Sequence, residues 1–96
     1  MKLVPWALIP LACAQQLPET CKPSPGLLKA LHDEASARVY DAVGAWFADH
    51  GDMKCALAAF EEAVRREPGS SEAHYDLGVA HVRMNQLAAA VKGVQL

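Results

Sequence analysis

The stretch ARVYDAVGAWFADHGDMKCALAAFEEAVRREPGS, residues 37–70, decides the fold, because its residue spacing recurs in the sequence that follows. Moving 34 residues along the chain takes Gly44 to Gly78 and Ala56 to Ala90. A period of about 20 to 50 residues is the sequence signature of a protein built from stacked structural repeats. The sequence therefore predicts two successive copies of one unit, of which the second stops short.

The first copy is expected to be two antiparallel helices joined by a tight turn. Residues 37–50 form the first helix, and Gly51 suits the left-handed position that ends it. Asp52 can cap the second helix through its carboxylate, and we expect that helix over residues 53–67. Pro68 then terminates it. The expected buried side chains of the two helices are Val39, Tyr40, Val43, Trp46, Phe47, Leu57, Phe60, Ala63 and Val64.

The outward face of the second helix is expected to be charged. Glu61 and Glu62 lie a helical turn before Arg65 and Arg66. Ion pairs at this spacing on a solvated helix surface contribute only a few tenths of a kcal/mol each. We therefore expect all four side chains to be solvated.

The second copy is expected to repeat the hairpin. Ser70 and Ser71 are good N-cap residues, and Glu72 places an acid in the first turn, as the helix dipole prefers. Asn85 stands where the first copy has its turn glycine, and it is the next best residue for a left-handed conformation. A second helix is then expected from Leu87. Its residues Ala88, Ala89, Val91, Val94 and Leu96 have nothing after them to cover them.

The chain resembles the tetratricopeptide repeat (TPR) family over residues 37–96, with one full repeat and most of a second. The pattern that carries the resemblance is Tyr40-x2-Val43-Gly44-x2-Phe47, then Ala56-x3-Phe60, then Pro68. It implies an all-α fold in which antiparallel helix-turn-helix repeats stack into an α-α superhelix, or solenoid. It also implies that the glycine and the first alanine mark the crossing of the two helices. The positions with a structural role in this pattern are Gly44, Ala56, Phe60, Ala63, Pro68, Gly78 and Ala90.

An incomplete array of repeats has consequences for the rest of the chain. A TPR unit cannot bury its apolar face alone, and about three or more stacked units are needed for a stable core. We therefore expect the N-terminal part of a longer exported protein, or a fragmentary gene prediction. The alternative is a protomer that self-associates through its exposed C-terminal helix.

The first residues have the pattern of a secretory signal peptide, residues 1–14. Lys2 precedes a short apolar run, and Ala12-Cys13-Ala14 forms a small-residue cleavage pattern. The run is shorter than the roughly 20 apolar residues that a membrane-spanning helix needs. We expect cleavage after Ala14, export to the periplasm or a similar secreted location, and no membrane association afterwards. The alternatives are a buried N-terminal segment of a cytosolic protein and, more weakly, a lipoprotein acylated at Cys13.

Residues 15–25 are expected to be a linker, because their prolines keep the backbone extended. Ser24 followed by Pro25 is a good helix start. Residues 26–36 are then expected to form an N-terminal capping helix, or an extension of the first repeat helix, with the break at Ser36. Either would cover the open apolar face of the first repeat.

The charge balance excludes one class of partner. The chain is 52% hydrophobic and 21% charged, which is typical of a soluble globular protein. Residues 15–96 hold eight Lys and Arg against eleven Asp and Glu, a net charge of −3. That balance argues against nucleic acid, which favours basic patches.

No residue pattern points to catalysis, a metal or a cofactor. The four histidines lack a ligand spacing such as H-E-x-x-H. His74 and His81 stand at aromatic places of the repeat pattern, so we expect them to pack between helices. Neither a nucleophile motif nor a Gly-rich phosphate loop is present. We therefore predict a non-catalytic protein without a metal or cofactor.

Cys21 and Cys55 remain after the predicted signal cleavage. An oxidising compartment would permit a disulfide between them. We favour the interpretation in which Cys55 is simply a small residue early in its helix, and keep the bridge as the alternative.

The resemblance also implies a partner-binding surface. TPR proteins bind ligands on a concave face lined mainly by the first helix of each repeat. Chaperone-binding members clamp a carboxylate there with basic and asparagine side chains, but this chain has Asp41 and Ala45 at two of those places. We expect instead a scaffold that binds a peptide or helix of another protein; the alternative is the accessory TPR region of a longer exported enzyme. By matching positions, the face comprises Arg38, Asp41, Ala45, Ala48, Asp49, Glu72, Tyr75, Val79, Val82 and Arg83.

Overall fold

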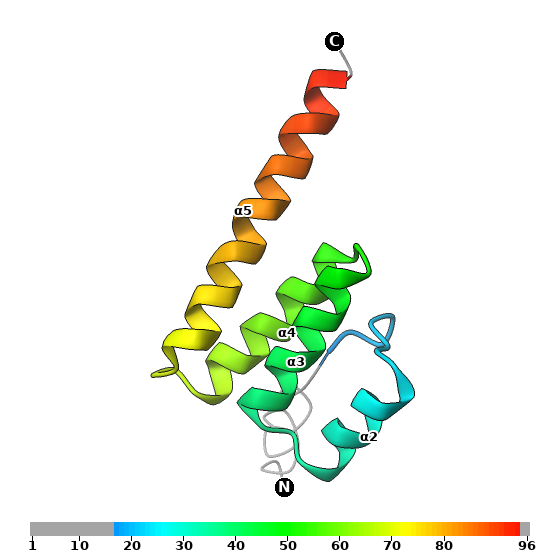
Figure 1. The fold of residues 1–96 in the computed structure, drawn as a ribbon, viewed down its shortest axis with the longest axis vertical. Helices are drawn as coiled ribbons and strands as arrows, with labels where there is room; N and C mark the ends of the chain where they lie inside the picture. Colours follow the sequence, from blue (N-terminus) through cyan, green and yellow to red (C-terminus); the bar gives the residue numbers. More distant parts are fainter. Residues whose placement is uncertain (1–16, 95–96) are drawn as a thin grey trace, which may run out of the picture.

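The computed structural model describes residues 17–94, which form four α-helices and no strand (Figure 1). The predicted signal peptide and its cleavage site lie outside the described residues. α3 and α4 lie side by side and antiparallel, α5 packs mainly against α4, and α2 packs against α3. The predicted all-α fold is therefore confirmed. The helices are α2 (Pro25–Asp33), α3 (Ala37–Asp49), α4 (Met53–Arg66) and α5 (Ser71–Val94).

Each helix begins at a polar side chain that accepts a backbone hydrogen bond three residues further on. The acceptors are Ser24, Ser36, Asp52 and Ser70, at distances of 3.4, 3.3, 3.1 and 3.1 Å from the respective nitrogens. Each cap satisfies one of the N–H groups that a helix start leaves free. The sequence predicted the caps at Ser24, Asp52 and Ser70 and placed the helix break at Ser36, whose cap makes α2 a separate helix and not an extension of α3.

The turn between α3 and α4 is closed by its glycine. Gly51 has φ of 79°, in the left-handed region that L side chains rarely adopt. The N–H of Gly51 donates to the Ala48 carbonyl at 3.1 Å, and the N–H of Asp52 donates to the Phe47 carbonyl at 2.9 Å. These bonds satisfy the last carbonyls of α3 and confirm the predicted C-terminal cap.

The crossing of α3 and α4 lies at Gly44. A Cβ atom added there would come within 2.5 to 2.8 Å of three ring atoms of Phe60. The ring therefore occupies the space that any other residue at position 44 would fill. Ala56 and Ala63 are completely buried on the same helix as Phe60, and Val43 is completely buried on α3.

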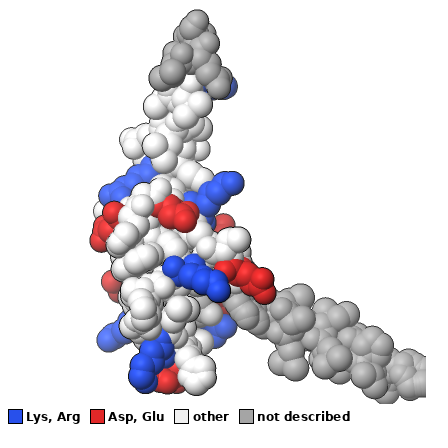
Figure 2. Space-filling model, turned by 90° about the vertical axis from the view of Figure 1, so that its right-hand side faces the viewer, with Lys and Arg blue, Asp and Glu red and all other residues white. Residues whose placement is uncertain are grey.

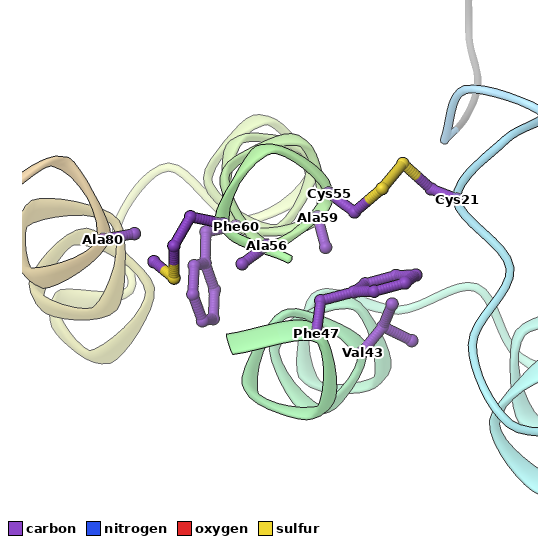
Figure 3. Packing of buried hydrophobic residues seen from close by; sticks show 9 residues of the cluster. Cys21, Val43, Phe47, Cys55, Ala56, Ala59, Phe60 and Ala80 are labelled. Atoms are coloured by element: carbon purple, nitrogen blue, oxygen red, sulfur yellow. A yellow bond between two sulfur atoms is a disulfide. The ribbon is translucent and has the colours of Figure 1, made fainter. Parts of the chain in front are cut away.

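A disulfide ties the N-terminal segment to this core (Figure 3). Cys21 and Cys55 are bonded, with their Cα atoms 5.5 Å apart, and both are buried. The interpretation of Cys55 as an unbonded small residue is therefore wrong. The disulfide depends on the tertiary structure, because it forms where the segment before α2 runs back past the start of α4. The bridge closes a loop that includes all of α2 and α3.

Glu62 is buried, with 4% of its surface exposed, which corrects the expectation of a solvated side chain. Its carboxylate accepts hydrogen bonds from Nε of Arg65 at 3.1 Å and from Nε of Arg66 at 2.8 Å. Arg66 also donates to the Ala35 carbonyl at 2.8 Å and lies 4.9 Å from the centroid of the Tyr40 ring. A buried carboxylate needs such paired partners. The hydrogen bond from Arg66 to the Ala35 carbonyl therefore fastens the end of α4 to the segment that connects α2 and α3, and Glu62 holds the guanidinium group of Arg66.

The predicted hairpin of the second copy is wrong. α5 continues without a break through Asn85 and past Leu87. The first copy turns at a glycine and restarts at an aspartate cap, whereas the second copy has Asn85 and then Gln86, which is not a preferred N-cap residue. The residues that follow are leucine and alanines, which are strong helix formers. Local propensity therefore outweighs the repeat pattern here.

Because α5 is straight, several residues of the second copy lack the predicted packing. A Cβ atom at Gly78 would meet nothing within 4 Å, and Ala90 is exposed, so neither marks a helix crossing among the described residues. His74 and His81 are also exposed and do not pack between helices. A ring nitrogen of His74 lies 2.8 Å from the Pro68 carbonyl, which is a local contact at the start of the helix.

One apolar stripe of α5 holds it to the body of the protein. Ala73 and Ala80 are buried, and Leu77 and Met84 pack beside them. The stripe continues at the same spacing to Leu87 and beyond, where α5 extends past α4 (Figure 1). None of the helices in residues 17–94 is long and apolar enough to span a membrane.

Candidate binding groove

A groove runs between α3 and α5, and we call it the α3–α5 groove. It contains a pocket of about 180 Å³. Ala45 and Ala48 form the α3 wall, and Val79 and Ala80 form the α5 wall. Small side chains on both helices leave the space open. The remaining lining residues are Asp49, Met53, Phe60, Asp76 and Arg83.

The floor of the pocket is the Phe60 ring. α4 projects this ring into the space among α3, α4 and α5, with Ala80 on the far side (Figure 3). Gly44 makes this position available, because any side chain there would collide with the ring. Phe60, which packs at the crossing of α3 and α4, thus also forms the floor of the pocket.

One end of the groove is acidic. Asp41 of α3 faces Glu72 and Asp76 of α5, and one carboxylate oxygen from each lies within 4.8 Å of the other two. Burial, reinforced by the Asp76 and Glu72 carboxylates, raises the pKa of Asp41 from 3.8 to about 6. Its Oδ1 atom is buried and accepts no hydrogen bond from the described residues. Asp41 therefore loses its proton less readily than an ordinary aspartate.

The sequence model of the tetratricopeptide repeat family matches residues 47–96, which is more than half of the chain. The chain belongs to the tetratricopeptide repeat family. No curated protein and no solved structure gave a significant match.

Membership in the TPR family indicates a general kind of function for the chain. TPR repeats typically mediate binding of protein partners and are generally non-catalytic. The first TPR unit is the closed hairpin of α3 and α4. The second is represented by α5, whose first half stands where the first helix of the next TPR unit belongs.

Eight of the ten residues that the TPR pattern assigned to a concave face line this groove, and Tyr75 and Val82 do not. Ala45, Ala48, Asp49, Val79 and Arg83 line the pocket itself. The acidic end holds Arg38, Asp41 and Glu72. Tyr75 and Val82 lie beside Val79 on the outer surface of α5, with 71% and 54% of their surfaces exposed.

Sequence reasoning missed three residues that line the groove. Asp76 joins the pocket to the acidic end, since it lines both. Phe60 and Met53 belong to α4, which the TPR pattern does not place on the concave face, yet both reach the pocket. The position of Asp76 one helical turn after Glu72 was a signal for a shared acidic face. No local signal indicated that Asp41 would lie opposite, because that depends on the packing of α5.

Charges of both signs are interspersed on the body of the molecule in Figure 2. The projecting end of α5 is mostly uncharged in the same view. Residues 84–91 contain no charged side chain. The projecting part of α5 between Arg83 and Lys92 is therefore an uncharged stretch of the surface.

Proposed function

We propose that this protein is a non-catalytic scaffold that binds an extended segment or a helix of a partner protein in the α3–α5 groove. The observation that carries the proposal is the pocket over Phe60, whose walls come from two successive TPR units. A site shared by two units suits the recognition of one continuous segment of a partner.

The groove offers an anchoring position for an apolar side chain. Its alanine and valine walls and its aromatic floor supply apolar area that a partner side chain can bury. The α3 wall and the α4 floor are held together by the contact of Gly44 with Phe60, and the disulfide fixes α4 to the N-terminal segment. Rigid walls reduce the entropy that is lost when a partner is bound.

The proposal includes export to the periplasm or a similar secreted compartment. The Cys21–Cys55 disulfide supports it, because such bonds persist in oxidising compartments and are rare in the cytosol. A direct test is to express the full chain with a C-terminal epitope and sequence the N-terminus of the mature protein. A mature protein that still begins at Met1 would contradict export by a cleaved signal.

A selection experiment tests the groove itself. A random peptide library is selected on the oxidised protein, and the selected peptides are measured against Val79→Arg, which puts a long charged side chain in the pocket wall. The matched control is Leu28→Arg, which makes the same kind of change at an exposed apolar residue of α2. We expect Val79→Arg to weaken binding by about tenfold or more, and Leu28→Arg to leave it unchanged. Peptides that are insensitive to Val79→Arg would place binding elsewhere.

A second proposal is that two copies associate through the projecting end of α5. Leu87 and Val91 are 52% and 56% exposed and continue the stripe that holds α5 to α4. A second copy suits this surface, because residues 84–91 are uncharged and two copies would not repel each other there. Light scattering after size exclusion should report a dimer that Leu87→Glu converts to a monomer. A wild-type monomer at high micromolar concentration would contradict the proposal.

A further inference from the structure

The acidic end of the groove and the apolar pocket adjoin each other. Ala45 and Asp76 line both the acidic end and the apolar pocket, so a segment lying along the groove would contact both of them. Asp41, Glu72 and Asp76 bring three carboxylates together, and one buried oxygen of Asp41 lacks a donor among the described residues. This combination carries information about the chemistry of the partner.

We propose that the groove selects a partner segment in which a Lys or Arg side chain stands next to an apolar one. The cationic group lies among Asp41, Glu72 and Asp76, and the apolar side chain enters the pocket over Phe60. This inference rests on the proposed function, because it specifies which segment the groove binds.

Electrostatics favour a cationic segment over an acidic one. Three carboxylates within 4.8 Å repel one another when all are ionised, and a cation among them relieves that repulsion. An ammonium or guanidinium group also offers several hydrogen-bond donors to the carboxylate oxygens. An acidic partner would add a fourth negative charge to a site where Arg38 is the only cationic lining residue.

The surroundings favour a side-chain cation over a metal ion. Calcium takes about six to eight oxygen ligands, whereas this cluster consists of the carboxylates of only three residues. Arg38 also lines the acidic end, and its positive charge would repel a divalent ion bound there. The adjoining apolar pocket has no role in metal binding, but it is used when the cation belongs to a peptide.

Binding of such a segment should be linked to a proton. Burial and its acidic neighbours raise the pKa of Asp41 to about 6, and a bound cation would lower it again. The charged groups that face Asp41 in this hollow are Arg38 from α3 and Glu72 and Asp76 from α5. Complex formation below about pH 6 should therefore release a proton, and affinity should rise with pH until Asp41 is ionised in the free protein.

The test uses three blocked peptides and the full oxidised chain. The peptides carry two Lys-Leu pairs, two Glu-Leu pairs or two Lys-Ser pairs in the same Gly-Ser background. Binding is followed by titration of the backbone amide signals of Ala45, Asp76 and Val79. We expect the Lys-Leu peptide to bind about tenfold more tightly than either of the others.

Two matched variants distinguish the effect of the acidic end on binding from the effect of the net charge of the protein. The triple variant Asp41→Asn, Glu72→Gln, Asp76→Asn neutralises the acidic end. The control variant Glu34→Gln, Glu61→Gln, Glu67→Gln removes the same number of charges from exposed residues outside the groove. We expect the first variant to weaken Lys-Leu binding about tenfold and to abolish its pH dependence, and the second to change neither by more than about twofold.

Several outcomes would overturn the inference. Equal binding of the Glu-Leu peptide at the same amides would overturn it while leaving groove binding, and with it the proposed function, intact. Equal effects of the two triple variants would reduce the selectivity to net charge and would also overturn it. Calcium chloride alone that saturates the acidic end, without any binding of the Lys-Leu peptide, would assign the site to a metal and overturn it as well. Failure of the proposed function is recognised separately, by selected peptides that ignore Val79→Arg.

Discussion

The first TPR unit is a closed hairpin, whereas the corresponding residues of the second unit form one straight helix. The two units share their glycine and alanine spacing, yet they differ at the turn. The first has Gly51 with a left-handed backbone and Asp52 as a cap, and the second has Asn85 and Gln86 inside α5. The repeat spacing therefore marks corresponding positions, but it does not by itself close a hairpin.

The two units also differ in what their second helix positions contact. In the first unit, α4 buries Phe60 against Gly44 and is bonded to the N-terminal segment through Cys55. In the second unit, residues 88–92 are exposed. A hairpin is thus closed by two features together: residues that favour a turn, and a surface of the same chain on which the second helix can pack. The second unit lacks the turn residues.

The largest effect is expected from the disulfide, which only the first unit has. The double variant Cys21→Ala, Cys55→Ala should lose about 3 to 4 kcal/mol of unfolding free energy, the chain-entropy value for a loop of this length. Urea unfolding of both proteins measures the loss. Reduction of the wild type should produce a similar loss, and the double variant should not respond to reductant. An unchanged urea midpoint in the reduced wild type would contradict the prediction.

A pair of glycine substitutions compares the two units directly. Gly44→Leu should cost about 3 kcal/mol, because its side chain would collide with the buried Phe60 ring. Gly78→Leu should instead stabilise the protein by about 0.5 to 1 kcal/mol, because the site is open and leucine is the better helix former. Thermal unfolding of both variants gives the comparison. A destabilising Gly78→Leu would mean that the second unit packs a helix against position 78 in solution.

A substitution at the acidic end tests the packing of α3 of the first unit against α5 of the second. Asp41→Asn removes the charge that burial and the α5 carboxylates disfavour, and we expect it to stabilise the protein by about 1 kcal/mol after allowance for solvent screening. The raised pKa makes the ionised native form less favourable, so wild-type stability from this group falls as pH rises from about 4 to about 6. The gain of the variant should therefore be greatest above about pH 6 and fade towards pH 4. A gain that does not change with pH would reject this origin.

The smallest effect on global stability is expected at Asn85. Proline inside a helix costs about 3 kcal/mol locally, but here that cost falls on a segment whose residues 88–92 are exposed. Asn85→Pro should therefore lose helical signal in circular dichroism with little change in the midpoint of thermal unfolding. Ala59→Pro, in the buried part of α4, is the contrasting variant and should unfold the protein. A large drop in the midpoint for Asn85→Pro would show that the end of α5 contacts the body.

Local chemistry made much of the fold predictable. The caps at Ser24, Asp52 and Ser70, the helix break at Ser36 and the glycine that ends α3 depend on neighbours within a few residues. Eight of the groove residues could be assigned from the repeat spacing, because position in a repeat fixes the face of a helix. The burial of Glu62 was missed, since it depends on Arg66 reaching the Ala35 carbonyl in another part of the chain.

The sequence by itself determined the helical class, the helix starts, the turn after α3 and the family, because these depend on short-range spacing and on capping chemistry. Only the tertiary structure decided the Cys21–Cys55 pairing, the acidic cluster of Asp41 with two residues of α5, and the pocket over Phe60. Each of these requires segments distant in sequence to meet, and the free energy of such contacts exists only once the helices are packed. The straight course of α5 combines both levels, since helix-forming residues continue it and no described surface draws its end back onto the body.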